Sequence, residues 1–186
     1  MERWVIKSEK NIFSSSVFTL KELRCAHPEK EDEFEFFILN SPDWINVVAV
    51  TENNEIIFVR QHRLGTDEYT YETPAGLMEK DEDPFDEARR ELLEETGYAP
   101  GSLRLMKKLS ANPAIQNNYI YFFCATGCTR ISGQDLDLQE DIDVELYPEE
   151  QVVHMIESGE IDHSIIVNAL NLYFSEKRRA ESSLSG

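Results

Sequence analysis

The first forty residues contain three short runs in which apolar and polar residues alternate, and this alternation predicts β-strands. The runs lie at 4–7, 17–23 and 34–39, and an acidic turn at 28–33 separates the last two. A free three-stranded sheet is only marginally stable, so we expect this one to pack on another surface. The pattern therefore predicts a small antiparallel sheet within an N-terminal region, residues 1–43.

Apolar runs in the rest of the chain predict a second, larger sheet. Two strands, 46–50 and 55–60, flank Glu52-Asn53-Asn54, whose composition is typical of a hairpin turn. Further strands are predicted at 69–74, 103–109, 119–125 and 144–147.

Two stretches near the C-terminus predict helices. Glu149 opens a helix that Gly159 ends, and Asp162 is placed to cap a final helix with regularly spaced apolar residues. Helices that lie between and after mixed strands predict an α/β sandwich over residues 44–175, with both sheet faces partly covered. The last stretch, 176–186, is polar, and we expect it to be a frayed tail.

The stretch after Gly76 carries the clearest local signals. Asp83 suits the N-cap of a helix, Pro84 suits its first position, and Gly97 is placed to end it with a positive φ. These residues predict a helix over 84–96, reached by a loop from the first glycine.

Three carboxylates gather at the end of this predicted helix. Glu91, Glu94 and Glu95 stand at i, i+3 and i+4, so they share one face, and like charges at that spacing cost roughly 0.2–0.5 kcal/mol per pair. They also lie at the negative end of the helix dipole, where carboxylates are disfavoured. A divalent cation would explain the arrangement, and ligands made only of oxygen suit Mg²⁺, with Mn²⁺ as the alternative.

The same stretch resembles the Nudix box, G-x5-E-x7-R-E-U-x-E-E-x-G-U, in which U is a bulky apolar residue. Only the last position departs, because Tyr98 replaces an aliphatic residue. This resemblance covers about residues 45–175 and implies the Nudix fold, an α/β/α sandwich with a mixed sheet. The matching positions are Gly76, Glu82, Arg90, Glu91, Leu92, Glu94, Glu95 and Gly97.

The composition of the chain limits the classes of partner that it can bind. The net charge is −18, from 36 acidic and 18 basic residues, which argues against nucleic acid or an anionic membrane as a general partner. No run of 18 apolar residues predicts a membrane span, and Met1–Asn11 lacks the core of a signal peptide. Three cysteines predict neither a disulfide framework nor a metal site. We therefore expect a cytoplasmic protein.

The Nudix resemblance assigns roles around the metal. It implies that the backbone carbonyl of Ala75 and the carboxylate of Glu82 assist the three glutamates in binding metal. It also implies that Arg90 orients a box glutamate, as a planar guanidinium can, so that Arg90, Glu91 and Glu94 are expected to be catalytic. For Glu82, a solvated side chain is the alternative.

Substrate contacts are predicted upstream of the box. Residues 59–63 resemble the V-R-Q-Y-R run of ADP-ribose pyrophosphatase-like members. Arg60 and Arg63 are therefore candidates to bind a diphosphate or a ribose, although either could instead pair with a surface carboxylate. Trp44 is a candidate to stack on a nucleobase, and a core position is the alternative.

Downstream of the box, the Asn-rich loop 112–118 resembles a branch acting on nucleoside diphosphate sugars. Pro113, Gln116 and Asn117 are candidate substrate contacts, and the alternative is a loop that caps its own backbone. In related enzymes a glutamate on a mobile loop acts as base or binds water. Glu140 is our first candidate for that role and Asp141 the second.

The sequence thus predicts a Mg²⁺-dependent enzyme that splits a nucleoside diphosphate sugar into a nucleoside monophosphate and a sugar phosphate. ADP-ribose as the main substrate, a non-catalytic sensor of nucleotide sugars and a partner scaffold are the alternatives. We also expect a homodimer, because the apolar residues of the N-terminal sheet exceed what a polar extension needs, and related hydrolases exchange such a sheet.

Overall fold

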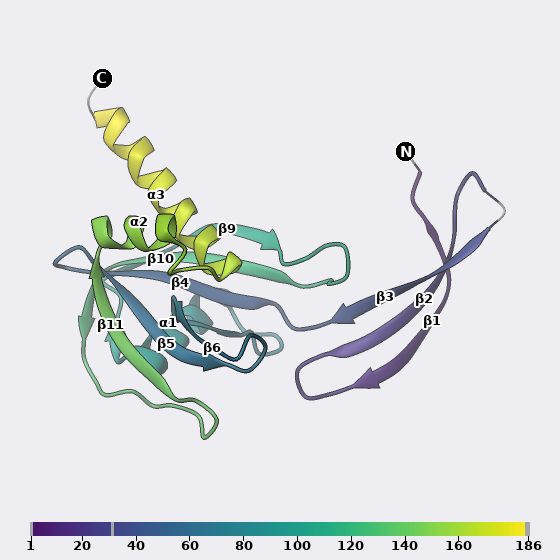
Figure 1. Cartoon of the computed structure of the whole chain (residues 1–186), viewed down its shortest axis with the longest axis horizontal. Helices are drawn as coiled ribbons and strands as arrows, with labels where there is room; N and C mark the ends of the chain where they lie inside the picture. The colour runs from purple at the N-terminus through teal and green to yellow at the C-terminus, as the bar shows by residue number, and fades with distance from the viewer. Residues whose placement is uncertain (1, 31, 185–186) are drawn as a thin grey trace. The chain divides into compact units, whose positions relative to one another are not determined.

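The structure is a computed structural model that describes residues 2–30 and 32–184. The chain divides into two compact units. The smaller unit comprises Met1–Asp43 and Leu109–Ile120, and the larger unit comprises Trp44–Lys108 and Tyr121–Gly186. Each unit contains a β-sheet of its own (Figure 1).

The smaller unit contains three antiparallel strands in the order β1-β2-β3 (the N-terminal sheet). These are β1 (Val5–Ser14), β2 (Thr19–Ala26) and β3 (Glu33–Asn40). The predicted small antiparallel sheet is therefore confirmed, although its first strand is longer than the apolar run indicated. Polar residues within β1 continue the backbone ladder after the alternation has ended, and backbone pairing does not require apolar side chains.

Most large apolar side chains of the N-terminal sheet are exposed. The ring of Trp4 packs edge-on against Phe34 and Phe36, with ring centroids 5.7 and 5.1 Å apart, yet all three rings remain exposed. Cys25 is the one fully buried hydrophobic residue among the described residues of these strands. The other exposed apolar residues of the sheet and its turns are Val5, Ile6, Ile12, Phe13, Val17, Phe18 and Phe37.

Loop 112–118 is bonded to the end of the N-terminal sheet. The backbone N–H of Asn117 donates to the carbonyl of Leu39 at 3.4 Å. Its side chain donates to Asn40 Oδ1 at 2.7 Å and accepts from the Ser41 amide at 3.4 Å. The loop is thus fixed to the segment that follows β3.

The larger unit contains the main sheet, which has eight strands in the described part of the chain. The strand order is β11-β5-β4-β10-β8, while β6 pairs with β5, β7 with β4, and β9 with β10. The bounds are β4 (Trp44–Thr51), β5 (Glu55–Arg63), β6 (Glu68–Glu72), β7 (Ala75–Leu77), β8 (Tyr98–Ala99), β9 (Ser102–Ser110), β10 (Tyr119–Arg130) and β11 (Ile142–Pro148).

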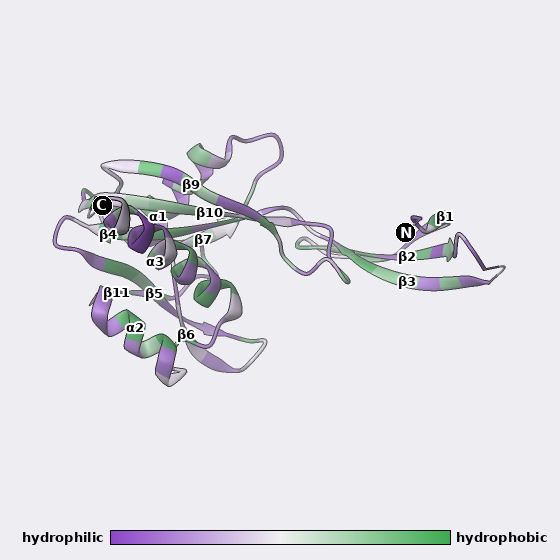
Figure 2. Ribbon diagram, turned by 90° about the horizontal axis from the view of Figure 1, so that it is seen from above, coloured by the Kyte–Doolittle hydropathy of each residue, from purple (hydrophilic) through white to green (hydrophobic). Residues whose placement is uncertain are grey.

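Helices cover both faces of the main sheet, which confirms the predicted α/β sandwich (Figure 1). Because side chains alternate across a strand, Val47 and Ala49 of β4 face α1 (Pro84–Thr96) and pack with its Ala88. The opposite face is covered by α2 (Glu149–Ser158) and α3 (Ser164–Leu184). In Figure 2, hydrophobic residues are green, and they are frequent along the strands of the main sheet that lie between the helices. None of the helices in the described ranges combines the length and hydrophobicity needed to span a membrane.

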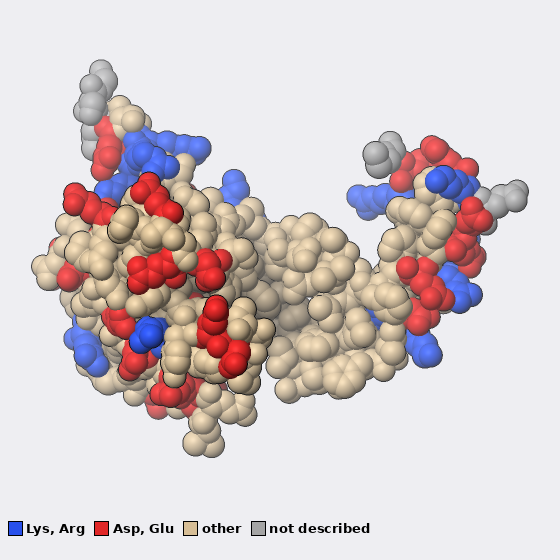
Figure 3. Space-filling view, viewed as in Figure 1, with Lys and Arg blue, Asp and Glu red and all other residues tan. Residues whose placement is uncertain are grey.

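One expectation about the larger unit is wrong, and two short strands were not expected. The predicted frayed tail is helical as far as the structure describes it, since α3 continues to Leu184 while 185–186 lie outside the described residues, and Arg104 of β9 pairs with Glu176 of that helix. The short strands β7 and β8 were not predicted, because two or three residues are too few to show alternation. Figure 3 shows acidic side chains in several patches of the visible face and basic side chains gathered near the end of α3, the part of the chain that contains Lys177, Arg178 and Arg179.

Candidate active site

The helix α1 has the predicted bounds because both of its ends are capped. Asp83 accepts a hydrogen bond from the amide of Phe85 at 2.8 Å, and Pro84 is the first helical residue. Gly97 adopts φ 76° and donates its N–H to the carbonyl of Leu93 at 2.7 Å. The three glutamates therefore lie in the last two turns, as expected.

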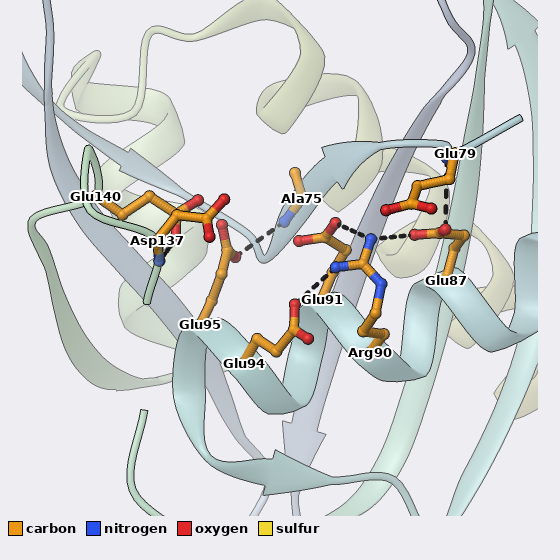
Figure 4. A network of polar contacts seen from close by, with 9 residues as sticks. All are labelled: Ala75, Glu79, Glu87, Arg90, Glu91, Glu94, Glu95, Asp137 and Glu140. Carbon is orange, nitrogen blue, oxygen red and sulfur yellow. Dashed lines mark hydrogen bonds and ion pairs between the residues drawn. The ribbon is translucent and has the colours of Figure 1, made fainter. Parts of the chain in front are cut away.

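Arg90 is the centre of a network of carboxylates on α1 (Figure 4). Its Nη1 donates to Glu94 at 2.6 Å, and its Nη2 donates to Glu91 at 2.8 Å and also to Glu87. One planar guanidinium thus orients three carboxylates, which agrees with the orienting role predicted for this arginine. Burial opposes the charge of Arg90, but the hydrogen bond to Glu87 and the neighbouring carboxylates raise its pKa.

Strand β7 brings two further predicted residues against this network. The backbone N–H of Ala75 donates to Glu95 at 3.1 Å (Figure 4). Gly76 lies so close to Glu91 that a Cβ built on the glycine would stand 2.0 Å from the Glu91 Oε1 atom. A side chain at position 76 would therefore displace the Glu91 carboxylate.

Two carboxylates of α1 are buried in surroundings that disfavour their negative charge. Glu91 is 8% exposed and Glu95 is 3% exposed. Burial raises the pKa of Glu91 to about 7, and the charges of Glu94 and Glu87 add to the effect of burial, while Arg90 opposes it. Burial likewise raises the pKa of Glu95 well above its usual range, although the Ala75 amide opposes the shift.

The donor set matches a hard divalent cation by chemical type, because it consists of oxygen atoms and carries more negative than positive charge. Among the described residues, no three His, Cys, Asp or Glu side chains already form a metal-binding group. In the structure Arg90 binds oxygens of Glu91 and Glu94, and the Ala75 amide binds a Glu95 oxygen.

Glu82 is fully exposed and lies in the loop that leads to α1. A hydrogen bond with the Glu87 carboxyl raises the pKa of Glu82, which places it beside the Arg90 network. Glu87 itself is fully buried and accepts a hydrogen bond from the backbone of Glu79 at 3.4 Å. The sequence reading missed Glu87, although its position three residues before Arg90 is an i, i+3 pairing signal.

An acidic loop before β11 contains the residues predicted to act on water. Glu140 accepts a hydrogen bond from the backbone N–H of Asp137 at 3.0 Å, and its charge helps raise the pKa of Glu95 (Figure 4). Asp141 is exposed. Of the two candidates, Glu140 is therefore the one shown to lie near the α1 carboxylates.

Gln134 fixes this loop to the end of α1, and sequence reasoning missed it. Its side-chain amide donates to the carbonyl of Glu95 at 2.8 Å and to that of Ile142 at 3.0 Å. The amide of Asp135 donates to the carbonyl of Glu94 at 2.9 Å. These bonds satisfy carbonyls that a helix C-terminus leaves unpaired, and they position the segment that contains Glu140.

The two arginines of β5 have different surroundings. Arg63 forms an ion pair with Glu72, which is a buried carboxylate and not the surface carboxylate of the alternative, and substrate contact by Arg63 stays a prediction. The Arg60 guanidinium lies over the rings of Tyr69 and Tyr71, 5.0 and 5.7 Å from their centroids. The charges of Glu95 and Glu140 act on Arg63, which places it near the α1 carboxylates.

The remaining predicted substrate contacts are more scattered. Trp44 is half-buried at the start of β4, and its indole N–H is buried without a hydrogen-bond partner in the described part of the chain. Pro113 is exposed, and Gln116 forms a β-bridge with Leu39 in the smaller unit. Both polar atoms of the Asn117 side chain are engaged within that unit. Substrate contact by these residues stays a prediction.

Comparison with known proteins agrees with this site. The model of the NUDIX domain family matches residues 42–169. A methanol dehydrogenase activator from Bacillus methanolicus is 30% identical over 181 residues, which cover 94% of this chain and 95% of that protein. An ADP-ribose pyrophosphatase from Bacillus subtilis strain 168 is 32% identical over 125 residues, covering 67% of this chain and 68% of the relative.

Two further matches extend this picture. A GDP-mannose pyrophosphatase from Enterobacter sp. strain 638 is 36% identical over 118 residues, which cover 59% of this chain and 61% of that protein. The crystal structure of an ADP compounds hydrolase superimposes with a TM-score of 0.86 and covers 97% of both chains at 20% identity. At that identity the structural match supports the fold alone.

Proposed function

Because this chain belongs to the Nudix family, we propose that it hydrolyses the diphosphate bond of ADP-ribose or of a nucleoside diphosphate sugar, with Mg²⁺ as the metal. The observation that carries the proposal is the arrangement of the box residues, in which Arg90 orients Glu91 and Glu94 while Glu95 accepts a hydrogen bond from the backbone of Ala75. Non-catalytic members of such a fold are expected to lose these carboxylates. The enzyme is therefore favoured over a sensor.

Glu91, Glu94 and Glu95 would hold the cation, with Glu82 and the Ala75 carbonyl assisting. A bound divalent cation supplies charge neutralisation for the diphosphate and lowers the pKa of the attacking water. Arg90 orients Glu91 and Glu94 through the hydrogen bonds it donates to their carboxylates. Glu140, held on its loop by the Asp137 amide, would accept the proton of the water.

The products would be a nucleoside monophosphate and a sugar phosphate, or AMP and ribose 5-phosphate from ADP-ribose. Relatives named for ADP-ribose and for GDP-mannose support this substrate class. Neither name decides between the two for this chain. Arg60, Arg63, Trp44, Pro113, Gln116 and Asn117 remain the proposed substrate contacts.

A substrate panel tests the proposal. Purified protein with Mg²⁺ is offered ADP-ribose, GDP-mannose, other nucleotide sugars and a nucleoside triphosphate, and the products are separated by anion-exchange chromatography. We expect ADP-ribose, GDP-mannose or both to be cleaved into a nucleoside monophosphate and a sugar phosphate. Failure to cleave any of them, while a known Nudix enzyme does so under the same conditions, would contradict the proposed activity.

We further propose that a second copy of the chain covers the N-terminal sheet. Supporting this are its exposed aromatic residues, including Trp4, Phe34 and Phe36, because clustered exposed apolar side chains often mark an interaction surface. Such an interface should exceed about 1,000 Å².

One observation favours a second candidate function, activation of a dehydrogenase partner. The match to the methanol dehydrogenase activator covers 94% of this chain, so it includes most of the N-terminal sheet. A dehydrogenase assay with and without this protein tests the idea. Activation that survives in a variant without hydrolase activity would separate the two functions.

A further inference from the structure

Glu72 is a buried carboxylate that the proposed chemistry does not use. It ends β6, and its side chain is only 3% exposed. Arg63 of the neighbouring strand donates to both of its oxygens, from Nε to Oε1 and from Nη2 to Oε2, each at 2.6 Å. Thr70 also donates to Oε1, at 2.7 Å. A bidentate pair of this kind fixes the orientation of a guanidinium as well as its position.

The pairing leaves one edge of the Arg63 guanidinium unused. Its Nη1 has no hydrogen-bond acceptor among the described residues, and the side chain is 46% exposed. The hydrogen bond with Glu72 is the main cause that raises the pKa of Arg63, and the charges of Glu95 and Glu140 contribute. The guanidinium therefore lies within the field of the α1 carboxylates. Free N–H donors at this place suit an oxygen of a bound phosphate.

The backbone after Glu72 is anchored independently of that side chain. Thr73 donates its hydroxyl to Asn46 at 2.9 Å, and the amide of Val47 donates to the carbonyl of Pro74 at 2.8 Å. The next residue, Ala75, is bonded to Glu95 as described above. Because each following residue has its own anchor, the particular contribution of Glu72 is to hold Arg63.

We propose that Glu72 is a positioning residue that acts through Arg63, keeping the free Nη1 edge directed to the diphosphate of the substrate. Glu72 itself does not touch the substrate. This inference rests on the proposed function, because it assigns the anion that Arg63 binds. It goes beyond that function by explaining why a carboxylate is buried on β6.

A double-mutant cycle tests the coupling. The affinity for a methylene-bridged ADP-ribose analogue, whose P–C–P link cannot be hydrolysed, is measured by calorimetry with Mg²⁺ for wild type, Glu72→Gln, Arg63→Met and the double variant. Each single change should weaken binding by about tenfold, since a hydrogen bond to a charged group is lost or misdirected. The double variant should bind no more weakly than Arg63→Met alone, whereas independent losses would multiply and overturn the inference.

Exposed Glu68 provides the matched control, because it stands directly opposite Arg63 in the β5–β6 register and forms no ion pair with it among the described contacts. Glu68→Gln should leave the affinity within about twofold of wild type, as expected for an exposed charge. An effect as large as that of Glu72→Gln would mean that net charge, not positioning, is responsible. Thr70→Val, which removes one contact to Glu72, should weaken binding by a smaller factor than Glu72→Gln.

Steady-state kinetics and melting curves separate the possible failures. With ADP-ribose, Glu72→Gln should raise KM more than it lowers kcat, because binding rather than water activation is affected. If Arg63→Met does not fold, since it leaves Glu72 buried and unpaired, Arg63→Lys replaces it in the cycle. A wild type that binds the analogue but shows independent losses overturns only this inference. A wild type that neither binds nor hydrolyses any diphosphate overturns the proposed function as well.

Discussion

The main sheet and the N-terminal sheet are built from similar apolar residues, but only the main sheet is covered by its own chain. Its strand β4 is almost entirely buried and so is the run Ile56–Val59 of β5, because α1 packs on one face and α2 with α3 on the other. In contrast, β1 is exposed along its whole length. The number of apolar residues in a strand therefore does not tell how far the strand is buried.

The difference assigns separate tasks to the two sheets. The main sheet has a complete core, so it can hold several carboxylates against one another on α1 despite their repulsion. The N-terminal sheet has exposed aromatic rings, and no helix is found among the described residues of its unit, so its surface is better suited to a partner. Changes on the main sheet should accordingly alter chemistry, whereas changes on the N-terminal sheet should alter assembly.

The largest effect is expected from Glu95→Gln. This change removes a carboxylate that we assign to the metal, and turnover should fall by about 10²-fold or more. The fold should survive, because repulsion from Glu91 is relieved. Asp86→Asn, on an exposed position of the same helix, is the control and should retain activity. Wild-type turnover by Glu95→Gln at saturating Mg²⁺ would remove the basis for assigning chemistry to this face.

Gly76→Ala should reduce kcat/KM by roughly 10–100-fold, because the added methyl group would displace the Glu91 carboxylate and small misplacements of catalytic groups are costly. Gly65→Ala is the matched control. A Cβ at Gly65 meets no atom within 4 Å, and this glycine is not among those with a positive φ, so its substitution should be silent. Equal effects of the two alanines would refute the close-approach argument.

Glu140→Gln should lower kcat by about tenfold while KM changes less, since a general base contributes to turnover rather than to binding. Its neighbour provides the discriminating variant. If Glu140→Gln has no effect and Asp141→Asn does, the base is one residue further along the loop.

On the N-terminal sheet, Phe36→Asp should convert a dimer into a species with a mass near 21.5 kDa, because a charge in an apolar interface is costly. Light scattering at micromolar concentration measures the mass. Val153→Asp, at a comparably exposed apolar position on α2, is the control and should leave the mass unchanged. A wild type that is already monomeric and fully active would show that the exposed rings have another purpose.

The smallest expected effect is on the pH dependence of the free energy of unfolding, and it concerns Glu72. Burial by itself would raise the pKa of Glu72, but Arg63 lowers it below the ordinary value. A carboxyl group with a lowered pKa in the folded state stabilises the protein above its unfolded pKa of about 4.3, and this contribution is lost as the pH falls through the folded pKa. Glu72→Gln should therefore cost roughly 1–3 kcal/mol at neutral pH and progressively less below about pH 4. Urea unfolding at both pH values measures the difference, and a gap that widens in acid would contradict it.

Local signals explain how much of the structure could be predicted. Capping residues Asp83 and Gly97 act within a few residues, so the bounds of α1 followed from the sequence. The Arg63–Glu72 pair did not, because the two residues are not opposite each other in the β5–β6 hairpin, where Arg63 faces Glu68 and Glu72 faces Val59, and the sequence left that register open. The two bonds from Gln134 to α1 and β11 were equally hidden, since a single amide in a polar loop has no periodic pattern.

Hydrolysis of ADP-ribose in ¹⁸O-labelled water, with Mg²⁺ and then with excess EDTA, tests the central claim most directly. The claim is that the carboxylate face of α1 supports metal-dependent attack of water on a diphosphate. Mass spectrometry should find one ¹⁸O atom in one of the two monophosphates, no orthophosphate, and no turnover after the metal is removed. Unchanged turnover in EDTA, or release of orthophosphate, would contradict the account.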